Sequence, residues 1–360
     1  MKTKRILIIR TDRIGDVALS TPVIKTLRGV YPDAYISFMV RPYARDIVEK
    51  NPYLDEVIIY DKYGRHKNFI STLIFGIGLR RKRFDTVLIL HPTNRAHIIA
   101  FLAGIPERIG YDRRLPFLLT KSLKDEKYRG QKHELEYTLD VLGRMGISEF
   151  DRSIFIPVSK EDEFLVDYRL SENGLEDKDC IITIHPSSSC PSKRWPLENY
   201  AALMKRIKAK YNCGIVVVSG PDEKNQVLEL LRLAGPDTFL DLAGSTSIGE
   251  LAALLKKSSV FISNDSGPVH ISVGVGTPCI VVFGRKQPGL SPQRWGPRGR
   301  NDIVLHKDVG CSACLAHNCK NNFKCLREIT VDEVFDAVNS LFSLKNNCNR
   351  ERLGNANLKR

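Results

Sequence analysis

A polar turn between two apolar segments carries the clearest chemical signal in the chain. Predicted strands at 260–263 and 279–283 flank the run Asn264-Asp265-Ser266-Gly267-Pro268-Val269-His270. This run supplies a helix-capping residue, a tight Gly and a Pro where an amide hydrogen is expendable. The free amides of such a helix, facing the carboxyl edge of a parallel sheet, suit a phosphate group, and His270 can also point at an anion. For the cap alone, an ordinary capped helix explains the pattern equally well.

A second polar turn lies near the N-terminus. An apolar strand at 5–9 runs into Arg10-Thr11-Asp12-Arg13-Ile14-Gly15-Asp16, and a helical pattern follows. Gly15 alone does not make a Gly-x-Gly-x-x-Gly dinucleotide loop, and no Gly-Lys-Ser/Thr follows as in a Walker loop. Asp16 and Asp12 are therefore candidate reactive carboxylates at a strand end, although an Asp in this position also suits a helix N-cap.

Two further strand ends carry polar residues. Ser188 and Lys193 lie in a hydroxyl-rich run after the strand at 181–185, and small hydroxyls with a Lys after a strand suit phosphate contact. Glu223 follows Ser219-Gly220-Pro221-Asp222 at another strand end. It is either a ligand-binding carboxylate or a first-turn acid that complements the helix dipole.

Strands and helices alternate in both halves of the chain, which predicts parallel sheets covered on both faces. The first half predicts strands at 5–9, 34–40, 56–59 and 86–90, and helices near 20–30, 43–50, 67–80, 94–103 and 131–146. The second half predicts strands at 180–185, 214–219, 239–241, 260–263 and 279–283, and helices at 197–210, 222–234, 247–256 and 267–274. A charged stretch at 157–178 is predicted to be either the linker between the domains or the first helix of the second domain. We expect domains at 1–160 and 175–343, a final helix near 330–343, and a basic, disordered tail at 344–360.

Four motifs in register resemble glycosyltransferase family 9, whose best-known members are the heptosyltransferases of lipopolysaccharide core assembly. They are Arg10–Asp16 with Thr21-Pro22, Lys193-Arg194-Trp195-Pro196, Gly220-Pro221-Asp222-Glu223, and Asn264–His270 with Gly276-Thr277-Pro278. The resemblance covers about residues 5 to 330. It implies an α/β fold of two Rossmann-like domains facing across a cleft, the GT-B architecture. The N-terminal domain would bind the acceptor and the C-terminal domain the nucleotide sugar.

The resemblance also implies a reaction. It would be a metal-independent, inverting transfer of a heptose or related sugar from ADP-heptose or a similar nucleotide sugar. The acceptor would be a lipopolysaccharide core or a related acidic glycolipid, and no cofactor is expected. Such a transfer needs a base for the acceptor hydroxyl and positive charge for the departing diphosphate. No Asp-x-Asp sequence stands at a strand end to hold a divalent ion, so the protein itself should supply that charge.

The resemblance assigns residues to these roles. Asp16 is the implied general base, and Glu223 is implied to accept hydrogen bonds from ribose hydroxyls. The full donor set is Ser188, Lys193, Glu223, Asp265, Ser266, Gly267 and His270. The acceptor set does not come from the resemblance: Asn94 and Arg95 follow the strand at 86–90 and could bind acidic groups, with help from Arg10 and Arg13. Arg285-Lys286-Gln287-Pro288 departs from the Gly-Pro-Thr-Asp-Pro-like run common after the last strand. That departure bears on the identity of the donor more than on the fold.

A net charge of +14 is the compositional outlier. The segment Lys62–Arg83 holds seven Lys and Arg residues and no acid, around an apolar middle. It reads equally as a surface helix with a basic loop or as a patch for an anionic membrane surface. No secretory signal and no membrane span are evident, so we expect a cytoplasmic protein, with peripheral association at the inner face of the cytoplasmic membrane as the second reading. Zinc-finger histidines, an aromatic RNA-binding motif and a basic zipper region are not found, so nucleic acid is not an expected partner.

Four of nine cysteines are clustered: Cys311, Cys314, Cys319 and Cys325. Thiolates at short spacing can hold zinc or an iron–sulfur cluster, although this spacing fits neither a paired Cys-x2-Cys ribbon nor a ferredoxin run. Reducing cytosol argues against obligatory disulfides. The interpretations, in order, are reduced or loosely structural thiols, a structural metal site, and a redox site.

Two other functions stay open from the sequence. The first is a catalytically silent nucleotide-sugar-binding or assembly protein on the same scaffold, for which Asp16→Ala would change nothing measurable. The second is a basic nucleic-acid-binding protein, which predicts an affinity for any duplex that falls steeply with salt.

Overall fold

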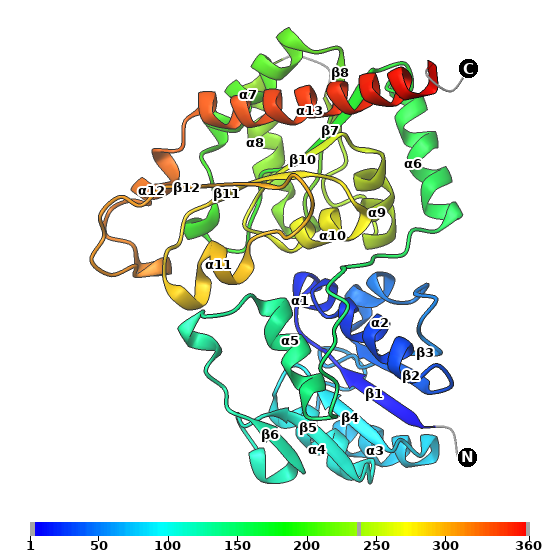
Figure 1. Cartoon of the computed structure of the whole chain (residues 1–360). Helices are drawn as coiled ribbons and strands as arrows, with labels where there is room; N and C mark the ends of the chain where they lie inside the picture. The colour runs from blue at the N-terminus through cyan, green and yellow to red at the C-terminus, as the bar shows by residue number, and fades with distance from the viewer. Residues whose placement is uncertain (1–3, 236–238, 358–360) are drawn as a thin grey trace. The chain divides into compact units, whose positions relative to one another are not determined.

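The computed structural model describes residues 4–235 and 239–357, with side chains described as far as Leu344. The chain divides into two compact units, shown with their elements in Figure 1. The first unit extends to Ser159 and includes Gln293–Trp295. The second comprises Lys160–Pro292 and the chain from Gly296 onward. Each unit has its own sheet and core.

Within its described residues, the first unit forms a six-stranded sheet in the order β3-β2-β1-β4-β5-β6, and every neighbouring pair is parallel. The strands are β1 (Arg5–Ile9), β2 (Tyr35–Val40), β3 (Glu56–Ile59), β4 (Thr86–Ile89), β5 (Glu107–Tyr111) and β6 (Lys121–Leu123). The α-helices are α1 (Ile14–Ala18), α2 (Thr21–Val30), α3 (Phe69–Gly78), α4 (Asn94–Leu102) and α5 (Glu134–Gly143). Short 3-10 helices cover Pro42–Ile47, Leu79–Lys82, Pro116–Leu118 and Lys127–Arg129. The strand order reverses between β1 and β4, so the residues that follow these two strands meet at the switch point of the sheet.

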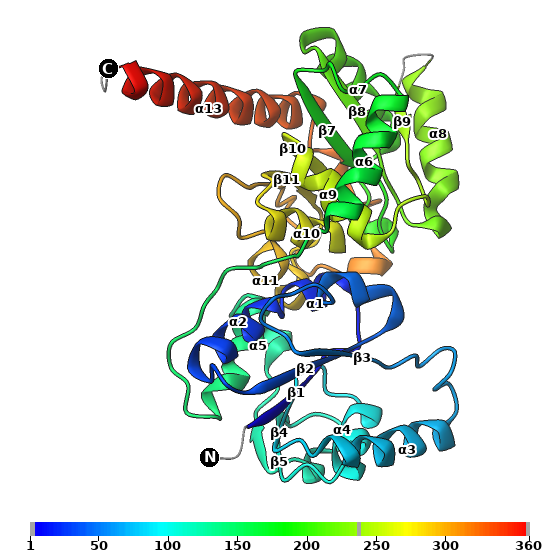
Figure 2. The same cartoon turned by 90° about the vertical axis from the view of Figure 1, so that its right-hand side faces the viewer.

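Both faces of the first sheet are covered by helices. Helices α3 and α4 pack together on one face, while α2 and α5 pack together on the other (Figure 2). Ile6 to Ile9 of β1 have an exposed fraction of zero, as expected for a central parallel strand buried on both sides. This burial explains why β1 is a continuous apolar run rather than an alternating one.

The second unit repeats the same arrangement. Its described residues form a six-stranded parallel sheet in the order β12-β11-β10-β7-β8-β9. The strands are β7 (Cys180–His185), β8 (Cys213–Val217), β9 (Leu240–Asp241), β10 (Val260–Asn264), β11 (Cys279–Phe283) and β12 (Ile303–His306). The α-helices are α6 (Lys160–Glu172), α7 (Leu197–Lys210), α8 (Lys224–Ala234), α9 (Ile248–Lys257), α10 (Gly267–Val275), α11 (Pro292–Trp295), α12 (Lys324–Arg327) and α13 (Val331–Asn357). Short 3-10 helices lie at Pro191–Lys193, Pro221–Glu223, Pro288–Leu290 and Ala316–Asn318. Here the switch point falls between β7 and β10.

Trp195 anchors the core of the second unit. Its ring is 1% exposed and stands edge-on to Tyr200 at 4.8 Å between ring centroids. The indole Nε1 donates to the Ile329 carbonyl at 2.9 Å, so its polar end is satisfied as a buried Trp requires. Trp195 thereby joins the segment that carries Lys193 to the segment that leads into α13.

Several predicted elements differ from the observed ones. Strands β5, β6 and β12 were missed, because Lys and Glu residues stand in β5 and β6 and because the residues of β12 are only half-buried. The predicted helix at 43–50 is the 3-10 helix Pro42–Ile47. The charged stretch at 157–178 contains α6, which groups with the second unit.

The last helix is longer than predicted. α13 runs from Val331 to Asn357, so its backbone is helical through most of the segment that we predicted to be a disordered tail at 344–360. Residues 358–360 and the side chains from 345 onward lie outside the description. Disorder of the tail at 344–360 therefore stays a prediction.

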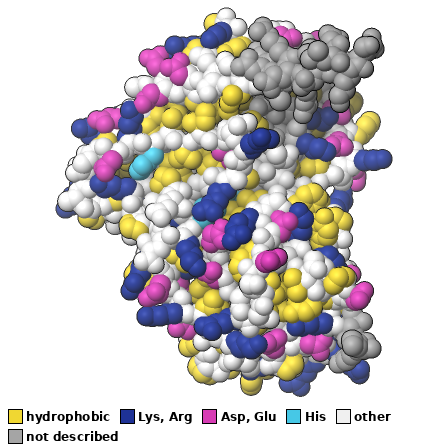
Figure 3. Space-filling model, viewed as in Figure 1, with side chains coloured by type: hydrophobic (Ala, Val, Ile, Leu, Met, Phe, Trp, Pro, Cys, Tyr) yellow, Lys and Arg dark blue, Asp and Glu magenta, His cyan; other side chains and the backbone are white. Residues whose placement is uncertain are grey.

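On the face shown in Figure 3, the basic residues are dispersed rather than gathered in one patch. In Figure 3, Lys and Arg side chains are spread over both units on the face shown, with Asp and Glu side chains between them. Across residues 4–235 and 239–357, none of the helices combines the length and apolar character needed to cross a membrane.

Candidate active site

Arg10 organises a buried cluster at the switch point of the first sheet. It directly follows β1 and is 2% exposed. Its Nε donates to Asp12 Oδ1 at 2.9 Å, and its Nη2 donates to Asp16 Oδ1 at 2.6 Å. Its Nη1 donates to the carbonyl of Leu90, the residue after β4, at 3.3 Å. One guanidinium therefore ties the ends of both central strands to two carboxylates.

Asp16 has the electrostatics of a base that works near neutral pH. Burial raises the pKa of its carboxyl to about 6, the charge of Asp12 adds to the rise, and Arg10 opposes it. Asp16 is the third residue of α1, whose N-cap is Arg13, so it is not the N-cap that the sequence allowed as an alternative. Its side chain accepts from Arg10 and is 14% exposed.

Glu134 and Lys127 complete this cluster and were not among the predicted site residues. Glu134 begins α5 and its side chain is 3% exposed. Its Oε1 accepts from Arg10 Nη2 at 3.3 Å and from Lys127 Nζ at 3.2 Å, and its Oε2 accepts from Arg294 Nη2 at 2.8 Å. Arg294 belongs to the short segment that groups with the first unit. Burial opposes ionisation of Glu134, but Lys127, Arg10 and Arg294 outweigh it and lower its pKa to about 2.

His91 stands beside the same cluster. Its Nδ1 lies 3.9 Å from Asp12 Oδ2, and burial followed by the charge of Arg10 lowers its pKa to about 4. At neutral pH its imidazole is therefore uncharged. We predicted no role for His91 from the sequence. Its position just after a central strand was the one feature that could have indicated a site residue.

The predicted acceptor residues are only partly brought together. Arg13 is exposed at the start of α1, and Asn94 is exposed at the start of α4. Arg95 is committed to backbone, because its guanidinium donates to the carbonyls of Lys62, His66 and Lys67 at 3.3, 3.2 and 2.6 Å. Acceptor binding by these residues stays a prediction, and for Arg95 it requires release from this loop.

The second cluster lies at the switch point of the second sheet. Asp265 follows β10, and its Oδ2 is 2.9 Å from Lys193 Nζ and 2.6 Å from Arg285 Nη2. Asn264 fixes the neighbouring loops, since its Oδ1 accepts from the Trp195 amide at 2.9 Å and its Nδ2 donates to the Pro186 carbonyl at 2.6 Å. The turns after β7 and β10 are thus held together.

The start of α10 has the form of an anion site. Ser266 is the N-cap, and its side chain makes no capping hydrogen bond, since its Oγ is instead 2.9 Å from Ser263 Oγ. Pro268 stands in the first turn, as the sequence predicted, and Gly276 closes the helix at φ 82°. Ser188 Oγ donates to the Asp265 carbonyl at 3.4 Å, and His270 is 4% exposed. Helix α10 begins just after the carboxyl end of β10, where the first amides of a helix can meet an anion.

Glu223 lies at the neighbouring strand end. It closes the 3-10 helix Pro221–Glu223 and precedes α8, and burial raises the pKa of its carboxyl. Its Oε2 is 3.9 Å from Nε2 of His185, whose own pKa burial lowers to about 4. A half-buried carboxylate beside a neutral imidazole is well placed to accept hydrogen bonds from hydroxyl groups.

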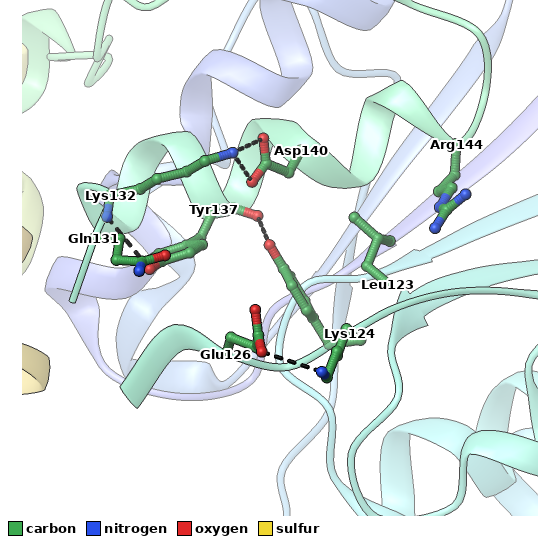
Figure 4. Close-up of a pocket in the computed structure, with 9 residues that line it drawn as sticks. Leu123, Lys124, Glu126, Gln131, Lys132, Tyr137, Asp140 and Arg144 are labelled. Atoms are coloured by element: carbon green, nitrogen blue, oxygen red, sulfur yellow. Dashed lines mark hydrogen bonds and ion pairs between the residues drawn. The ribbon is translucent and has the colours of Figure 1, made fainter. Parts of the chain in front are cut away.

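A pocket of about 270 Å³ in the first unit borders the first cluster but shares none of its residues, since Lys127 Nζ lies 4.3 Å from the ring centroid of Tyr111. It is lined by residues of β5, β6, α5 and the loops between them (Figure 4): Tyr111, Leu123, Lys124, Glu126, Gln131, Lys132, Tyr137, Asp140 and Arg144. Lys132 Nζ is bound to both carboxylate oxygens of Asp140, and Tyr111 donates to the Tyr137 carbonyl. The predicted site residues do not line this pocket.

The four clustered cysteines are free thiols. Asn321 Nδ2 donates to Cys311 Sγ at 3.3 Å, and the Phe323 amide donates to Cys319 Sγ at 3.4 Å. In the described part of the chain, no group of three or more His, Cys, Asp or Glu residues is arranged to hold a metal ion. Metal binding by Cys311, Cys314, Cys319 and Cys325 stays a prediction.

Two Rossmann-like units, each with a polar cluster at its switch point, define a glycosyltransferase of the GT-B architecture. The sequence profile described as glycosyltransferase family 9 (heptosyltransferase) matches residues 73–324, and the chain belongs to this family. The resemblance, the fold class and the enzyme class predicted from the sequence are confirmed.

Curated relatives and solved structures match nearly the whole chain. Lipopolysaccharide heptosyltransferase 2 of Escherichia coli (strain K12) is 23% identical over 345 residues, covering 94% of this chain and 98% of that protein. Lipopolysaccharide heptosyltransferase 3 of the same strain is 26% identical over 338 residues, covering 91% and 95%. The crystal structure of the glycosyl transferase family 9 from Veillonella parvula DSM 2008 is 28% identical with a TM-score of 0.82, covering 95% and 98%. The structure of E. coli ADP-heptose lps heptosyltransferase II shares the fold at 22% identity, with a TM-score of 0.76 and coverage of 95% and 99%.

Proposed function

We propose that the protein transfers a heptose or related sugar from ADP-heptose, or a similar nucleotide sugar, to a lipopolysaccharide core or related acidic glycolipid. The transfer inverts the anomeric centre and needs no metal ion. Support comes from relatives named for lipopolysaccharide heptosyl transfer and from the two clusters at the switch points. The observation that carries the proposal is Asp16, a largely buried carboxylate with a pKa near 6 in the helix that follows the central strand of its sheet.

The reaction is a single displacement. Asp16 takes the proton of the acceptor hydroxyl, and the acceptor oxygen forms a bond to the anomeric carbon. The bond from that carbon to the diphosphate oxygen breaks on the opposite face, and the nucleoside diphosphate leaves with the electron pair. A general base with a pKa near the working pH combines a deprotonated population with useful basicity. Arg10 holds Asp16 through the 2.6 Å hydrogen bond and fixes its orientation.

The donor occupies the second unit in this proposal. The diphosphate lies at the start of α10, where backbone amides and Lys193 offset its charge. Ser188, Ser266 and Gly267 border that position, and His270 and Asp265 support it from α10 and the turn before it. Glu223 accepts hydrogen bonds from the ribose hydroxyls of the nucleoside, a role that suits its half-buried carboxylate.

The acceptor occupies the first unit and carries negative charge. Arg13 and Asn94 are exposed at the starts of α1 and α4, the helices that follow the two central strands, and are the first candidates for its acidic groups. Arg10 is committed to carboxylates, and we assign it to orientation of Asp16 as well as to local positive charge.

We further propose that the first unit docks on an anionic membrane surface from the cytoplasmic side. Helix α3 exposes a stripe of large apolar side chains: Phe69, Ile70, Ile74 and Ile77 are 57, 68, 65 and 50% exposed. Exposed cations flank the stripe at Arg65, Lys67, Arg81 and Arg83. An apolar helix face bordered by cations suits insertion at the level of lipid headgroups.

The general-base assignment is tested with Asp16→Asn. This variant should bind the donor nearly as the wild type does, because Asp16 lies in the other unit from the donor residues. Its turnover should fall by about 10²–10⁴-fold, the range for loss of a general base. Turnover close to wild type would exclude Asp16 as the base. The anomeric configuration of the product, read by NMR, tests inversion independently.

A further inference from the structure

Arg285 is a buried cation at the carboxyl edge of the second sheet, near the proposed donor residues. The predicted site did not include it. It follows Gly284 at the carboxyl end of β11 and is 5% exposed. Its place in the fold depends on Gly284, because a Cβ there would lie 2.8 Å from the Ser192 carbonyl oxygen. Only glycine lets the turn of Arg285 approach the turn of Lys193 this closely.

Arg285 and Lys193 share one acceptor atom. Lys193 Nζ and Arg285 Nη2 both lie on Asp265 Oδ2, at 2.9 and 2.6 Å. The side chains of Asp265 and Arg285 are 8 and 6% exposed, so water does not screen them well. Lys193 alone neutralises Asp265, so Arg285 leaves one positive charge in excess at the start of α10. The dipole of that helix adds to the excess.

An uncompensated positive charge in a buried site costs free energy unless an anion offsets it. Arg285 Nε is also buried without a hydrogen-bond partner, and so is Ser187 Oγ at the end of β7, the neighbour of β10. Native proteins rarely leave buried donors unmet. Both features are accounted for if a ligand with several acceptor oxygens completes the site.

Lys286, the next residue, is neither buried nor without a counterion. It is exposed, and its Nζ pairs with Asp308 Oδ1 at 2.8 Å. Arg285 and Lys286, which stand where the Gly-Pro-Thr-Asp-Pro-like run is usual, therefore differ in their surroundings. Lys286 is a surface residue, whereas Arg285 is buried near the start of α10.

We propose that Arg285 binds the diphosphate of the nucleotide sugar and stabilises it as it leaves. This inference rests on the proposed glycosyl transfer and adds a residue to its donor site. The diphosphate carries two negative charges in the nucleotide sugar and three after the bond to the anomeric carbon breaks. Lys193 and Arg285 together meet this growth in charge, and the guanidinium fork matches two phosphate oxygens at once.

The test compares ligands that differ only in phosphate. Calorimetric affinities for ADP and adenosine are measured for wild type, Arg285→Met and Arg285→Lys, with Lys286→Gln as the matched control. We expect Arg285→Met to weaken ADP by about 10- to 100-fold, the usual cost of a lost charged hydrogen bond, and to change adenosine less than about twofold. Arg285→Lys should recover part of the ADP affinity, and Lys286→Gln should match wild type. A fall in kcat should accompany the ADP effect.

Other outcomes overturn the inference. Equal loss of ADP and adenosine would mean that Arg285 only shapes the turn, and unchanged ADP affinity would mean that it is only a counterion of Asp265. If Arg285→Met does not fold, Arg285→Gln, which keeps a donor for Asp265, carries the same comparison. Lys193→Ala, measured in parallel, separates a failure of the proposed diphosphate site from a failure of the Arg285 assignment. If Lys193→Ala also weakens ADP no more than adenosine, the proposed diphosphate site is wrong. If Lys193→Ala weakens ADP more than adenosine, a negative result for Arg285→Met concerns Arg285 alone.

Discussion

Arg10 and Glu134 are 124 residues apart in the chain and are joined by a hydrogen bond of 3.3 Å between Nη2 and Oε1. The same Nη2 donates to Asp16 at 2.6 Å, so a helix that begins at Glu134 is connected to the candidate base through one guanidinium. Lys127 and Arg294 hold Glu134 from its other sides. If Asp16 is the base, as proposed, we expect Glu134 to be a positioning residue that acts through Arg10.

Glu134→Gln should therefore change the pH dependence of turnover. The charge of Glu134 raises the pKa of Asp16, and it also competes for Arg10. Its removal should lower the pKa of Asp16, so the acidic limb of the kcat profile should move to lower pH. A purely structural role would lower activity at every pH without moving the limb. The measurement is kcat from pH 4.5 to 8.5, with Lys132→Gln, whose partner Asp140 lies outside the cluster, as control.

Asp16→Asn should stabilise the protein at neutral pH. The folded-state pKa of Asp16 is raised above its usual value, so the folded protein pays to ionise it as the pH rises from about 4 through 6. The variant removes that cost, which is at most about 3 kcal/mol for a shift of this size. Urea unfolding should show the variant more stable than wild type at pH 7.5 and equal to it near pH 3.5. Lower stability at pH 7.5 would show that Asp16 is held mainly by attraction to Arg10.

The sequence predicted the parts of the site that local pattern determines. Asp265 directly follows an apolar strand, and Asp16 and Lys193 lie in the short helical segments that come next after one, so their setting can be read from neighbouring residues. The α/β class followed from the alternation of strands and helices, and the family followed from the order of the motifs. These features need no knowledge of distant contacts.

Other features depend on contacts that no local pattern reveals. Glu134 was not among the predicted site residues, and its ion pairs with Arg10 and Lys127 arise only when the residue after β1 and the start of α5 meet in the folded chain. Arg95 looked free to bind an acceptor, yet the loop from Lys62 to Lys67 folds over its guanidinium. From the sequence, Arg285 was noted only as a departure from a motif. Its burial against Asp265 is the contact that led to the proposal that it binds the diphosphate.

Activity should survive exhaustive treatment with EDTA. In the proposed mechanism, Lys193, Arg285 and the start of α10 provide the charge that a divalent ion would otherwise provide for the leaving diphosphate. A slow loss that follows a fall in the melting temperature would point to a structural metal at the cysteines. Prompt loss of activity with an unchanged melting temperature, restored by magnesium or manganese, would contradict the mechanism.

Membrane docking through α3 predicts separable electrostatic and apolar contributions. Lys82 pairs with Glu56, and Arg80 donates to the Leu102 carbonyl, so these two cations are less suited to a test. The informative cations are Arg65, Lys67, Arg81 and Arg83, and the informative apolar pair is Ile70 and Ile74.

Replacing these four cations with Gln should weaken binding to anionic vesicles, because each cation near such a surface contributes about 1 kcal/mol. Ile70→Ser with Ile74→Ser should weaken the same binding, because two exposed side chains lose their burial among headgroups. The control for charge replaces four exposed cations of the second unit with Gln: Lys178, Lys205, Lys224 and Arg232. Vesicle sedimentation measures binding, and activity on a short soluble acceptor should stay at the wild-type level in both test variants. If the control weakens vesicle binding as much as the test set, net charge rather than the α3 surface holds the protein at the membrane.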